Sequence, residues 1–228
     1  MNDIEKNIND IRNRIDKAAK KAGHTGEDVQ LMAVSKTKTR EQVEAAYRAG
    51  LRLFGENRVQ EAYEKYESFY PDARLHLIGH LQSNKAKQAV EIACCVQSID
   101  KLKTARELEK RCAAIDKQMD IFMEYNTSGE DSKSGYLSKD SMYADIEQIA
   151  SFPHLKIRGF MTIGPFTDDS DEIRRAFVLL KSYYEESKER FPELPIDQLS
   201  MGMTSDFEIA VEEGSTMVRI GTALFGSR

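Results

Sequence analysis

The sequence predicts an α/β protein that folds as one closed (β/α)8 barrel. A short apolar run rich in strand-forming residues is followed by a longer amphipathic stretch, and this alternation occurs eight times along the 228 residues. No Gly/Ser-rich or Pro-rich stretch separates two halves, so residues 1–228 are expected to form a single domain. Because barrels of this kind typically have about 250 residues, the loops should be short. An open, doubly wound sheet is the structural alternative.

An amphipathic helix is expected before the first strand. Four isoleucines recur at helical spacing, namely Ile4, Ile8, Ile11 and Ile15. The pattern ends near Gly23, so residues 1–23 should form a helix that packs on the barrel.

The eight predicted strands are short apolar runs, each followed by a helical pattern. They are Leu31–Ser35, Leu51–Phe54, Arg74–Ile78, Cys94–Ser98, Met119–Tyr125, Lys156–Met161, Asp197–Ser200 and Met217–Ile220. Ser138 and Ser170 precede two of the helical patterns, as N-cap residues do. Ser205 and Glu208 have the spacing of a capping box at the start of another.

Composition and charge exclude several classes of protein. The net charge is −5, with acids and lysines mixed along the chain, so no basic stripe is available for a nucleic acid. No apolar run approaches the roughly 18 residues of a transmembrane helix, and acids occupy the N-terminus where a signal peptide would be apolar. The protein has three cysteines, Cys94, Cys95 and Cys112, and this odd number predicts no disulfide framework. We therefore expect a cytoplasmic protein.

Reactive groups of such a barrel are expected at the C-terminal ends of its strands. The polar and flexible residues found there include Lys36 after the first strand, Asn57 after the second, His80 after the third, and Met161 with Thr162 at the sixth. His76 and His80 have a helical zinc spacing, but they lie on a strand and its following turn, and no third ligand is apparent. A metal site is therefore not expected.

Lys36 is the most unusual of these residues. Met32, Val34 and Lys36 share one face of a strand with a period of two, and that face is expected to point into the barrel. A lysine that has reached solvent at the end of a strand explains the position equally well. The functional interpretation is an amine that is desolvated enough to act as a nucleophile.

A phosphate site is predicted from the loops after the seventh and eighth strands. The first loop offers Ser200, Gly202 and Ser205 before a new helix, whose free N–H groups favour an anion. The second offers Gly221 and Thr222. These two loops form the usual phosphate site of (β/α)8 barrels, although each taken alone could be an ordinary turn.

Seven sequence motifs in order resemble the pyridoxal phosphate homeostasis protein family, which is related to the N-terminal barrel of alanine racemase. The motifs are AVSKTK, FGENRVQE, HLIGHLQSNK, VQSID, NTSGEDSKSG, RGFMTIGP and SMGMTSDFEIAVEEGSTMVRIGTALFG. Two positions depart from the family pattern: Arg58, where an aromatic residue is common, and Thr204, where serine is common.

The resemblance implies a barrel of PLP fold-type III that binds the vitamin B6 cofactor pyridoxal 5′-phosphate (PLP). Lys36, rather than Lys38, would form the internal aldimine, and Arg219 would face the pyridine nitrogen. The phosphate would contact residues of both loops: Ser200, Gly202, Ser205, Gly221 and Thr222. The ring and its 3-hydroxyl side would be lined by Asn57, His80 and Met161.

The implied function is intracellular PLP homeostasis, in which the protein holds PLP as a reversible aldimine and supplies it to apo-enzymes without turnover. Related racemases have an additional β-domain that builds a dimer and provides a tyrosine base, whereas this chain stops at Arg228. We therefore expect a non-catalytic monomer. A PLP-dependent racemase or lyase with His80 or water as the base is the first alternative. A cofactor-free phosphosugar aldolase using Lys36 is the second.

Overall fold

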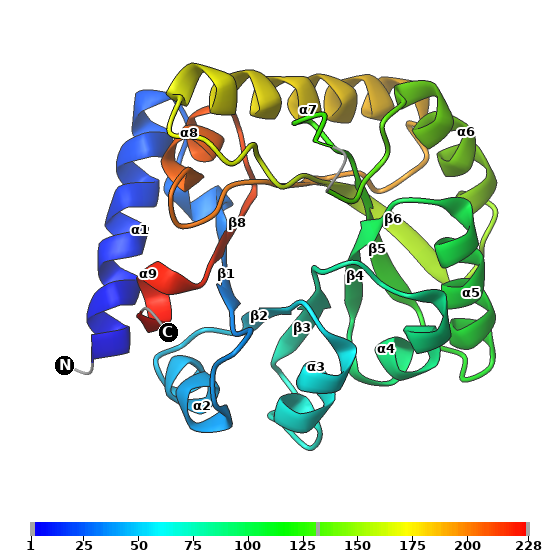
Figure 1. The fold of residues 1–228 in the computed structure, drawn as a ribbon, viewed down its shortest axis with the longest axis horizontal. Helices are drawn as coiled ribbons and strands as arrows, with labels where there is room; N and C mark the ends of the chain where they lie inside the picture. Colours follow the sequence, from blue (N-terminus) through cyan, green and yellow to red (C-terminus); the bar gives the residue numbers. More distant parts are fainter. Residues whose placement is uncertain (1–2, 131–132, 227–228) are drawn as a thin grey trace.

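The computed structural model describes residues 3–130 and 133–226 and is a closed barrel of eight parallel strands in chain order, surrounded by helices (Figure 1). Strand β8 pairs with β1, so the sheet has no open edge. The predicted barrel is confirmed, and the doubly wound open sheet is excluded. The predicted domain, residues 1–228, extends at both ends into residues outside this description.

The barrel strands overlap all eight predicted strands. They are β1 Gln30–Val34, β2 Leu53–Glu56, β3 Arg74–Leu77, β4 Cys95–Ile99, β5 Met119–Glu124, β6 Leu155–Met161, β7 Gln198–Ser200 and β8 Met217–Ile220. Only β2 differs by more than one residue at its ends, because the N–H of Leu51 donates to Ala46 O and so belongs to the end of the preceding helix. As a result Glu56 lies within the strand instead of beyond it.

The helices cover the outside of the barrel. They are α1 Asp3–Lys21, α2 Arg40–Arg48, α3 Val59–Tyr66, α4 Ala86–Ile92, α5 Leu102–Ala113, α6 Lys139–Ile149, α7 Ser170–Arg190, α8 Phe207–Glu212 and α9 Thr222–Phe225, with 3-10 turns at Gly26–Asp28 and Ser83–Lys85. The predicted N-terminal helix is confirmed as α1, which buries Ile8, Ile11 and Ile15 and packs beside α8 and α9 (Figure 1). Among the helices described, none is both long and apolar enough to cross a membrane.

The observed helix caps agree only in part with those predicted from the sequence. Ser138 caps α6 by accepting a hydrogen bond from the N–H of Ser141, as predicted. Helix α7 begins at Ser170, but Asp169 is its cap. The capping box predicted at Ser205 is wrong, because α8 begins only at Phe207. The loop after β7 is therefore longer than expected.

Two apolar layers hold the fold together. The larger one fills the space between the strands and the helices. The smaller one lies inside the barrel and consists of Met32, Val34, Leu53, Ile78, Cys95, Phe122, Met161 and Met217. Met32 and Val34 therefore point inward, as the period of two predicted, and the chain leaves β1 toward the barrel mouth at Lys36.

Strands β6 and β7 are in close backbone contact at Gly159. A Cβ atom added to Gly159 would lie 1.8 Å from the carbonyl oxygen of Gln198, which is backbone and cannot rotate away. The pairing of these strands, which ends at Met161 and Ser200, therefore depends on the absence of a side chain here.

The Gly159→Ala variant is expected to lower the free energy of unfolding by about 3 kcal/mol, because the methyl group forces the strands apart. Gly50→Ala is the matched control: its φ is +96°, but nothing lies within 4 Å of the added atom. Strain alone should cost that variant about 1 kcal/mol. Urea unfolding of the three proteins measures both effects, and equal losses would contradict the close-contact explanation.

Candidate functional site

Lys36 lies in a small pocket at the C-terminal end of the barrel, where β1 and β8 meet. The pocket has a volume of about 80 Å³ and is lined by two loops, residues 36–38 with Val34 on one side and Gly221, Thr222 and Gly226 on the other. Parallel pairing of β1 with β8 brings these loops together. The structure thus places the predicted lysine beside two of the predicted phosphate residues.

The amine of Lys36 is open to this pocket. Its side chain is exposed, and no described residue forms a hydrogen bond or ion pair with it. Lys38 lines the same pocket, but its Nζ donates a hydrogen bond of 2.9 Å to Gly226 O. The two lysines therefore differ in surroundings although only Thr37 separates them.

The loop after β7 lies against the loop after β8. The N–H of Ala223 donates to Thr204 Oγ1 at 3.4 Å, and the N–H of Arg219 donates to Gly202 O at 3.0 Å. The N–H groups of Ser205, Gly221 and Thr222 donate to no acceptor within residues 3–130 and 133–226. Unpaired backbone donors of this kind suit the oxygens of an anion.

Gly202 permits the close packing of the first of these loops. Its φ is +92°, and an added Cβ atom would lie 2.5 Å from the Cβ of Ala210 and 2.8 Å from the Cα of Phe207. The loop therefore folds tightly onto α8. Because α8 has six residues and starts after Ser205, an anion here would depend on loop N–H and hydroxyl groups more than on a helix terminus.

Arg219 and Ser200 interact inside the barrel. Arg219 is buried, and its guanidinium donates to Ser200 O and Ser200 Oγ, both at 2.8 Å, and to Thr162 O at 2.6 Å. Ser200 Oγ donates in turn to Gln97 Oε1 at 2.8 Å. Burial lowers the pKa of Arg219 to about 10, so the group is still a cation at neutral pH.

The other predicted site residues, Met161, Asn57 and His80, do not line the pocket of Lys36. Met161 is part of the apolar layer inside the barrel. Asn57 and His80 share a neighbouring pocket of about 290 Å³, formed by the loops after β2 and β3. These loops touch, since an added Cβ atom on Gly79 would lie 2.4 Å from Asn57 O. His80 Nδ1 also lies 3.1 Å from a carboxylate oxygen of Asp100.

Glu124 is a buried acid at the C-terminal end of a barrel strand, and the sequence analysis did not identify it. It ends β5, is buried, and its Oε2 has no hydrogen-bond partner among the described residues. Burial and, second, the nearby charge of Asp100 raise the pKa of Glu124 to about 7, although Arg219 opposes this shift. Its position could have been noticed, since Phe122 and Glu124 share one face of the predicted strand and an acid on an inward face is unusual.

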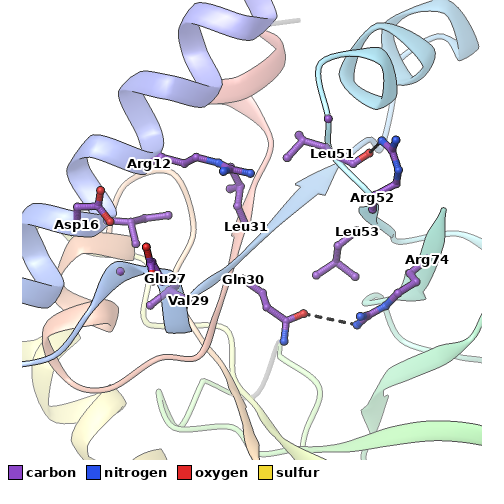
Figure 2. Close-up of a pocket in the computed structure, with 13 residues that line it drawn as sticks. Arg12, Asp16, Glu27, Val29, Gln30, Leu31, Leu51, Arg52, Leu53 and Arg74 are labelled. Carbon is purple, nitrogen blue, oxygen red and sulfur yellow. Dashed lines mark hydrogen bonds between the residues drawn. The ribbon is translucent and has the colours of Figure 1, made fainter. Parts of the chain in front are cut away.

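A larger pocket lies at the opposite end of the barrel. It has a volume of about 530 Å³ and lies between α1 and the starts of β1 and β2. Figure 2 shows three arginines around it, Arg12, Arg52 and Arg74. The guanidinium of Arg52 is already paired with Asp72 at 2.6 Å. Since reactive groups of these barrels lie at the C-terminal ends of the strands, size alone does not locate the site.

Comparison with known proteins places the chain in a family. Residues 6–228 match the family described as "Alanine racemase, N-terminal domain". The pyridoxal phosphate homeostasis protein of Pasteurella multocida is 42% identical over 99% of this chain and 97% of its own length. The chain belongs to the pyridoxal phosphate homeostasis protein family.

Solved structures agree with this family assignment. PipY of Synechococcus elongatus, a structure with PLP bound, is 33% identical, covers 98% of this chain and 100% of its own, and gives a TM-score of 0.86. An alanine racemase of Clostridium difficile gives a TM-score of 0.74 at 13% identity, and it covers 96% of this chain and 60% of its own. The racemase shows the shared fold alone.

The buried carboxyl group of Glu124 predicts a pH dependence of stability. Its pKa rises from 4.5 in the unfolded chain to about 7 in the folded protein, so the folded state binds the proton more tightly. Between these values the free energy of unfolding should fall as the pH rises, by roughly 2 to 3 kcal/mol between pH 5 and pH 8.

Glu124→Gln should remove this part of the pH dependence, because an amide does not titrate. Urea unfolding at both pH values measures it as the difference between wild type and variant. Glu91→Gln, at an exposed position, is the control and should follow the wild type. If the free energy of unfolding changes equally with pH in wild type and Glu124→Gln, folding does not raise the pKa of Glu124.

Proposed function

We propose that this protein binds PLP reversibly on Lys36 and buffers or supplies it inside the cell without catalysing a reaction. When bound, PLP supplies an aldehyde that condenses reversibly with a primary amine. The observation that supports the proposal most directly is one pocket that contains the amine of Lys36 and the N–H groups of Gly221 and Thr222, none of which has a partner among the described residues. A family named for PLP homeostasis and a relative solved with PLP support the choice of ligand.

The phosphate would be held by the two loops that meet beside Lys36. The N–H groups of Ser205, Gly221 and Thr222 are available donors, and Gly202 lets the first loop fold tightly. Thr204, at a position where the family pattern has serine, keeps a hydroxyl at the junction of the loops. Hydrogen bonds to a charged group contribute about 1.5 to 3 kcal/mol each, so several would retain PLP even without a covalent bond.

Arg219 would restrain the chemistry of the bound cofactor. Three hydrogen bonds fix its guanidinium inside the barrel, and Ser200, which we propose also contacts the phosphate, accepts two of them. A permanent cation next to the pyridine nitrogen disfavours protonation of that nitrogen and weakens the ring as an electron sink. This arrangement favours a carrier over an enzyme.

Asn57, His80 and Met161 are proposed to line the ring and its 3-hydroxyl side. Met161 lies inside the barrel, whereas Asn57 and His80 lie in the adjoining pocket. We further propose that the protein acts in the cytoplasm as a monomer and that apo forms of PLP-dependent enzymes receive the cofactor.

A weak PLP-dependent racemase or lyase is the alternative, and one contact favours it. His80 Nδ1 lies 3.1 Å from Asp100 Oδ2, which leaves Nε2 available as a base at the barrel mouth. The buried cation of Arg219 argues against fast carbanion formation. The two functions differ in whether amino acids lose their α-proton on the protein.

Lys36→Ala is expected to remove the absorbance band of lysine-bound PLP and to leave only weaker, non-covalent binding. The phosphate loops remain intact in this variant, so residual affinity should be measurable by equilibrium dialysis. Lys38→Ala is the matched control, since Lys38 lines the same pocket. It should keep the band. Borohydride reduction followed by peptide mapping identifies the labelled lysine, and a label on Lys38 in the wild type would refute the assignment.

The PLP-loaded protein is expected to exchange the α-protons of amino acids with deuterium oxide no faster than free PLP does. Proton nuclear magnetic resonance of an amino acid mixture measures this directly. Exchange at least about tenfold faster than free PLP, lost in His80→Gln, would instead support the racemase or lyase with His80 as base.

A further inference from the structure

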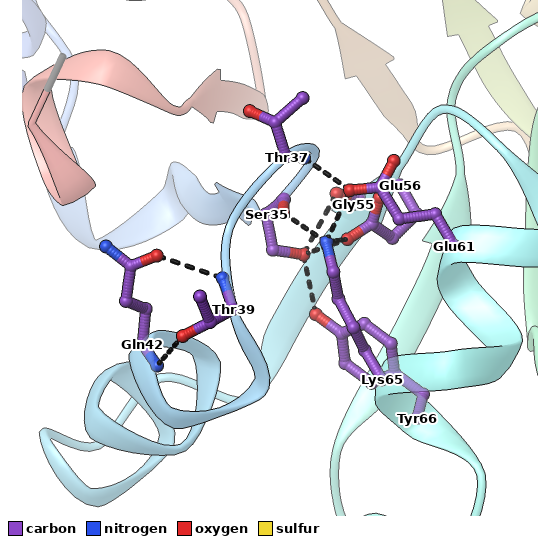
Figure 3. Close-up of polar contacts among 9 residues, drawn as sticks. All are labelled: Ser35, Thr37, Thr39, Gln42, Gly55, Glu56, Glu61, Lys65 and Tyr66. Carbon is purple, nitrogen blue, oxygen red and sulfur yellow. Dashed lines mark hydrogen bonds and ion pairs between the residues drawn. The ribbon is translucent and has the colours of Figure 1, made fainter. Parts of the chain in front are cut away.

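A buried polar network lies directly beneath the loop that contains Lys36. It consists of Ser35, Glu56, Glu61, Lys65 and Tyr66, and we call it the Lys65 network (Figure 3). Lys65 and Glu61 come from α3, Glu56 from β2, and Ser35 from the end of β1. None of these residues belongs to the proposed PLP contacts. They contact Ser35 and Thr37, the residues on either side of the proposed reactive lysine.

Every proton of the Lys65 ammonium has an acceptor. Lys65 Nζ lies 2.6 Å from Ser35 O, 2.8 Å from Glu56 Oε1 and 2.7 Å from Glu61 Oε1. An ammonium has three donors, so the set is complete. Lys65 is only 7% exposed, and a buried cation of this kind requires such partners.

Ser35 is held at each of its polar atoms. Its N–H donates to Gly55 O at 3.0 Å, and its carbonyl oxygen accepts from Lys65. Its hydroxyl donates to Glu56 Oε1 at 2.7 Å and lies 2.7 Å from the hydroxyl oxygen of Tyr66. The residue immediately before Lys36 is therefore fixed by β2 and by α3.

Thr37, immediately after Lys36, adopts an unfavourable backbone conformation. Its φ is +63°, a region that β-branched residues rarely occupy. The N–H of Lys38 donates to Ser35 O at 3.0 Å, so Lys36 and Thr37 are the central residues of a β-turn. The N–H of Thr37 donates to Glu61 Oε1, the same oxygen that accepts from Lys65. Glu61 thus holds the strained side of the turn.

The charges of the network are consistent with this arrangement. Burial raises the pKa of Glu56, and hydrogen bonds from Lys65 and Ser35 offset only part of that effect. Burial also opposes ionisation of Glu61, but hydrogen bonds from Lys65 and from the N–H of Thr37 lower its pKa overall. Lys65 thus pairs with both carboxylates, and Glu61, whose pKa is lowered, is the one in contact with the turn.

We propose that Glu61 and Lys65 are positioning residues, which hold the Ser35–Lys38 turn so that the amine of Lys36, and not that of Lys38, meets the aldehyde of the ligand. This inference rests on the proposed function, because it assumes that Lys36 binds PLP. The two residues touch no part of the ligand. They act through the backbone on both sides of Lys36.

A relaxed turn would lose this selectivity. Lys36 and Lys38 both line the pocket and are two residues apart, so a change at Thr37 redirects both side chains. Effective concentrations of a tethered amine depend steeply on orientation. Selection between two neighbouring lysines is therefore the property that a positioning role should control.

The test compares Glu61→Ala with Glu61→Gln and Glu64→Ala. Alanine removes the acceptor of the Thr37 N–H, whereas glutamine keeps an oxygen in its place. Glu64 is exposed on the same helix and is the matched control. The side chain of Glu61 is 22% exposed and alanine favours helix, so the variant is expected to fold. Lys65→Arg, which keeps the buried charge but not the three-way geometry, is the second variant.

Two quantities are measured. In the PLP-free protein, amide hydrogen exchange at Thr37 should become at least about tenfold faster in Glu61→Ala and stay near wild type in Glu61→Gln. After borohydride reduction with PLP, the ratio of label on Lys36 to label on Lys38 should fall at least about fivefold in Glu61→Ala and in Lys65→Arg. Glu61→Gln should restore most of the ratio, and Glu64→Ala should leave both quantities unchanged.

The outcomes separate this inference from the proposed function. Wild-type protein without label on Lys36 contradicts the proposed function itself. Label on Lys36 in the wild type with an unchanged ratio in Glu61→Ala and Lys65→Arg overturns the positioning role, even where Thr37 exchanges faster. Unchanged exchange at Thr37 in Glu61→Ala also overturns it, since the turn would then be held without Glu61.

Discussion

The parallel pairing of β1 with β8 is the interaction on which the rest of the structure depends. These strands are the first and last of the barrel, and their register aligns residues more than 180 positions apart in the sequence, such as Met32 with Arg219. Closure removes the sheet edges and encloses the inner apolar layer. It also brings the loop of Lys36 to the loop of Gly221 and Thr222. An open sheet of the same strands would separate Lys36 from Gly221 and Thr222.

Inside the closed barrel, polar residues form a continuous path beside the apolar ones. His76 Nδ1 lies 2.9 Å from Gln97 Nε2, Gln97 Oε1 accepts from Ser200, and Ser200 accepts from Arg219. Burial lowers the pKa of His76 to about 3, so the imidazole is neutral and can accept a hydrogen bond through Nδ1. The path fixes Arg219 from the barrel interior. The orientation of this cation is therefore set by side chains from β3, β4 and β7.

The sequence allowed most of the fold and part of the site to be predicted, and the differences have physical causes. Alternation of apolar runs and helical patterns identified the eight strands because burial on both faces leaves a local signature. Lys36, Gly221 and Thr222 could be grouped because strand ends of a barrel share one face. The helix start at Phe207 was misplaced, because Ser205 matches a capping box although Asp206 is the cap. Local spacing does not decide between such competing caps.

Roles that depend on long-range contacts could not be predicted. Tyr66 packs against Phe54, but its hydroxyl also meets Ser35 across 31 positions. Lys65 resembles any surface lysine of an amphipathic helix until the position of Glu56 in β2 is known. The strand was predicted at Leu51–Phe54 but lies at Leu53–Glu56, so Glu56 was expected to lie beyond its end. A small shift in one strand boundary thus concealed a buried ion pair.

The exposure of Lys36 has a consequence for the exchange of a bound ligand. The amine lies at the rim, in a shallow pocket between two short loops. A ligand bound to this amine stays in contact with solvent. The residence time of the ligand is then determined by the lifetime of its bonds to the protein. An amine in solution could also attack the ligand carbon that is bonded to Lys36. Such a site is suited to handing its ligand over.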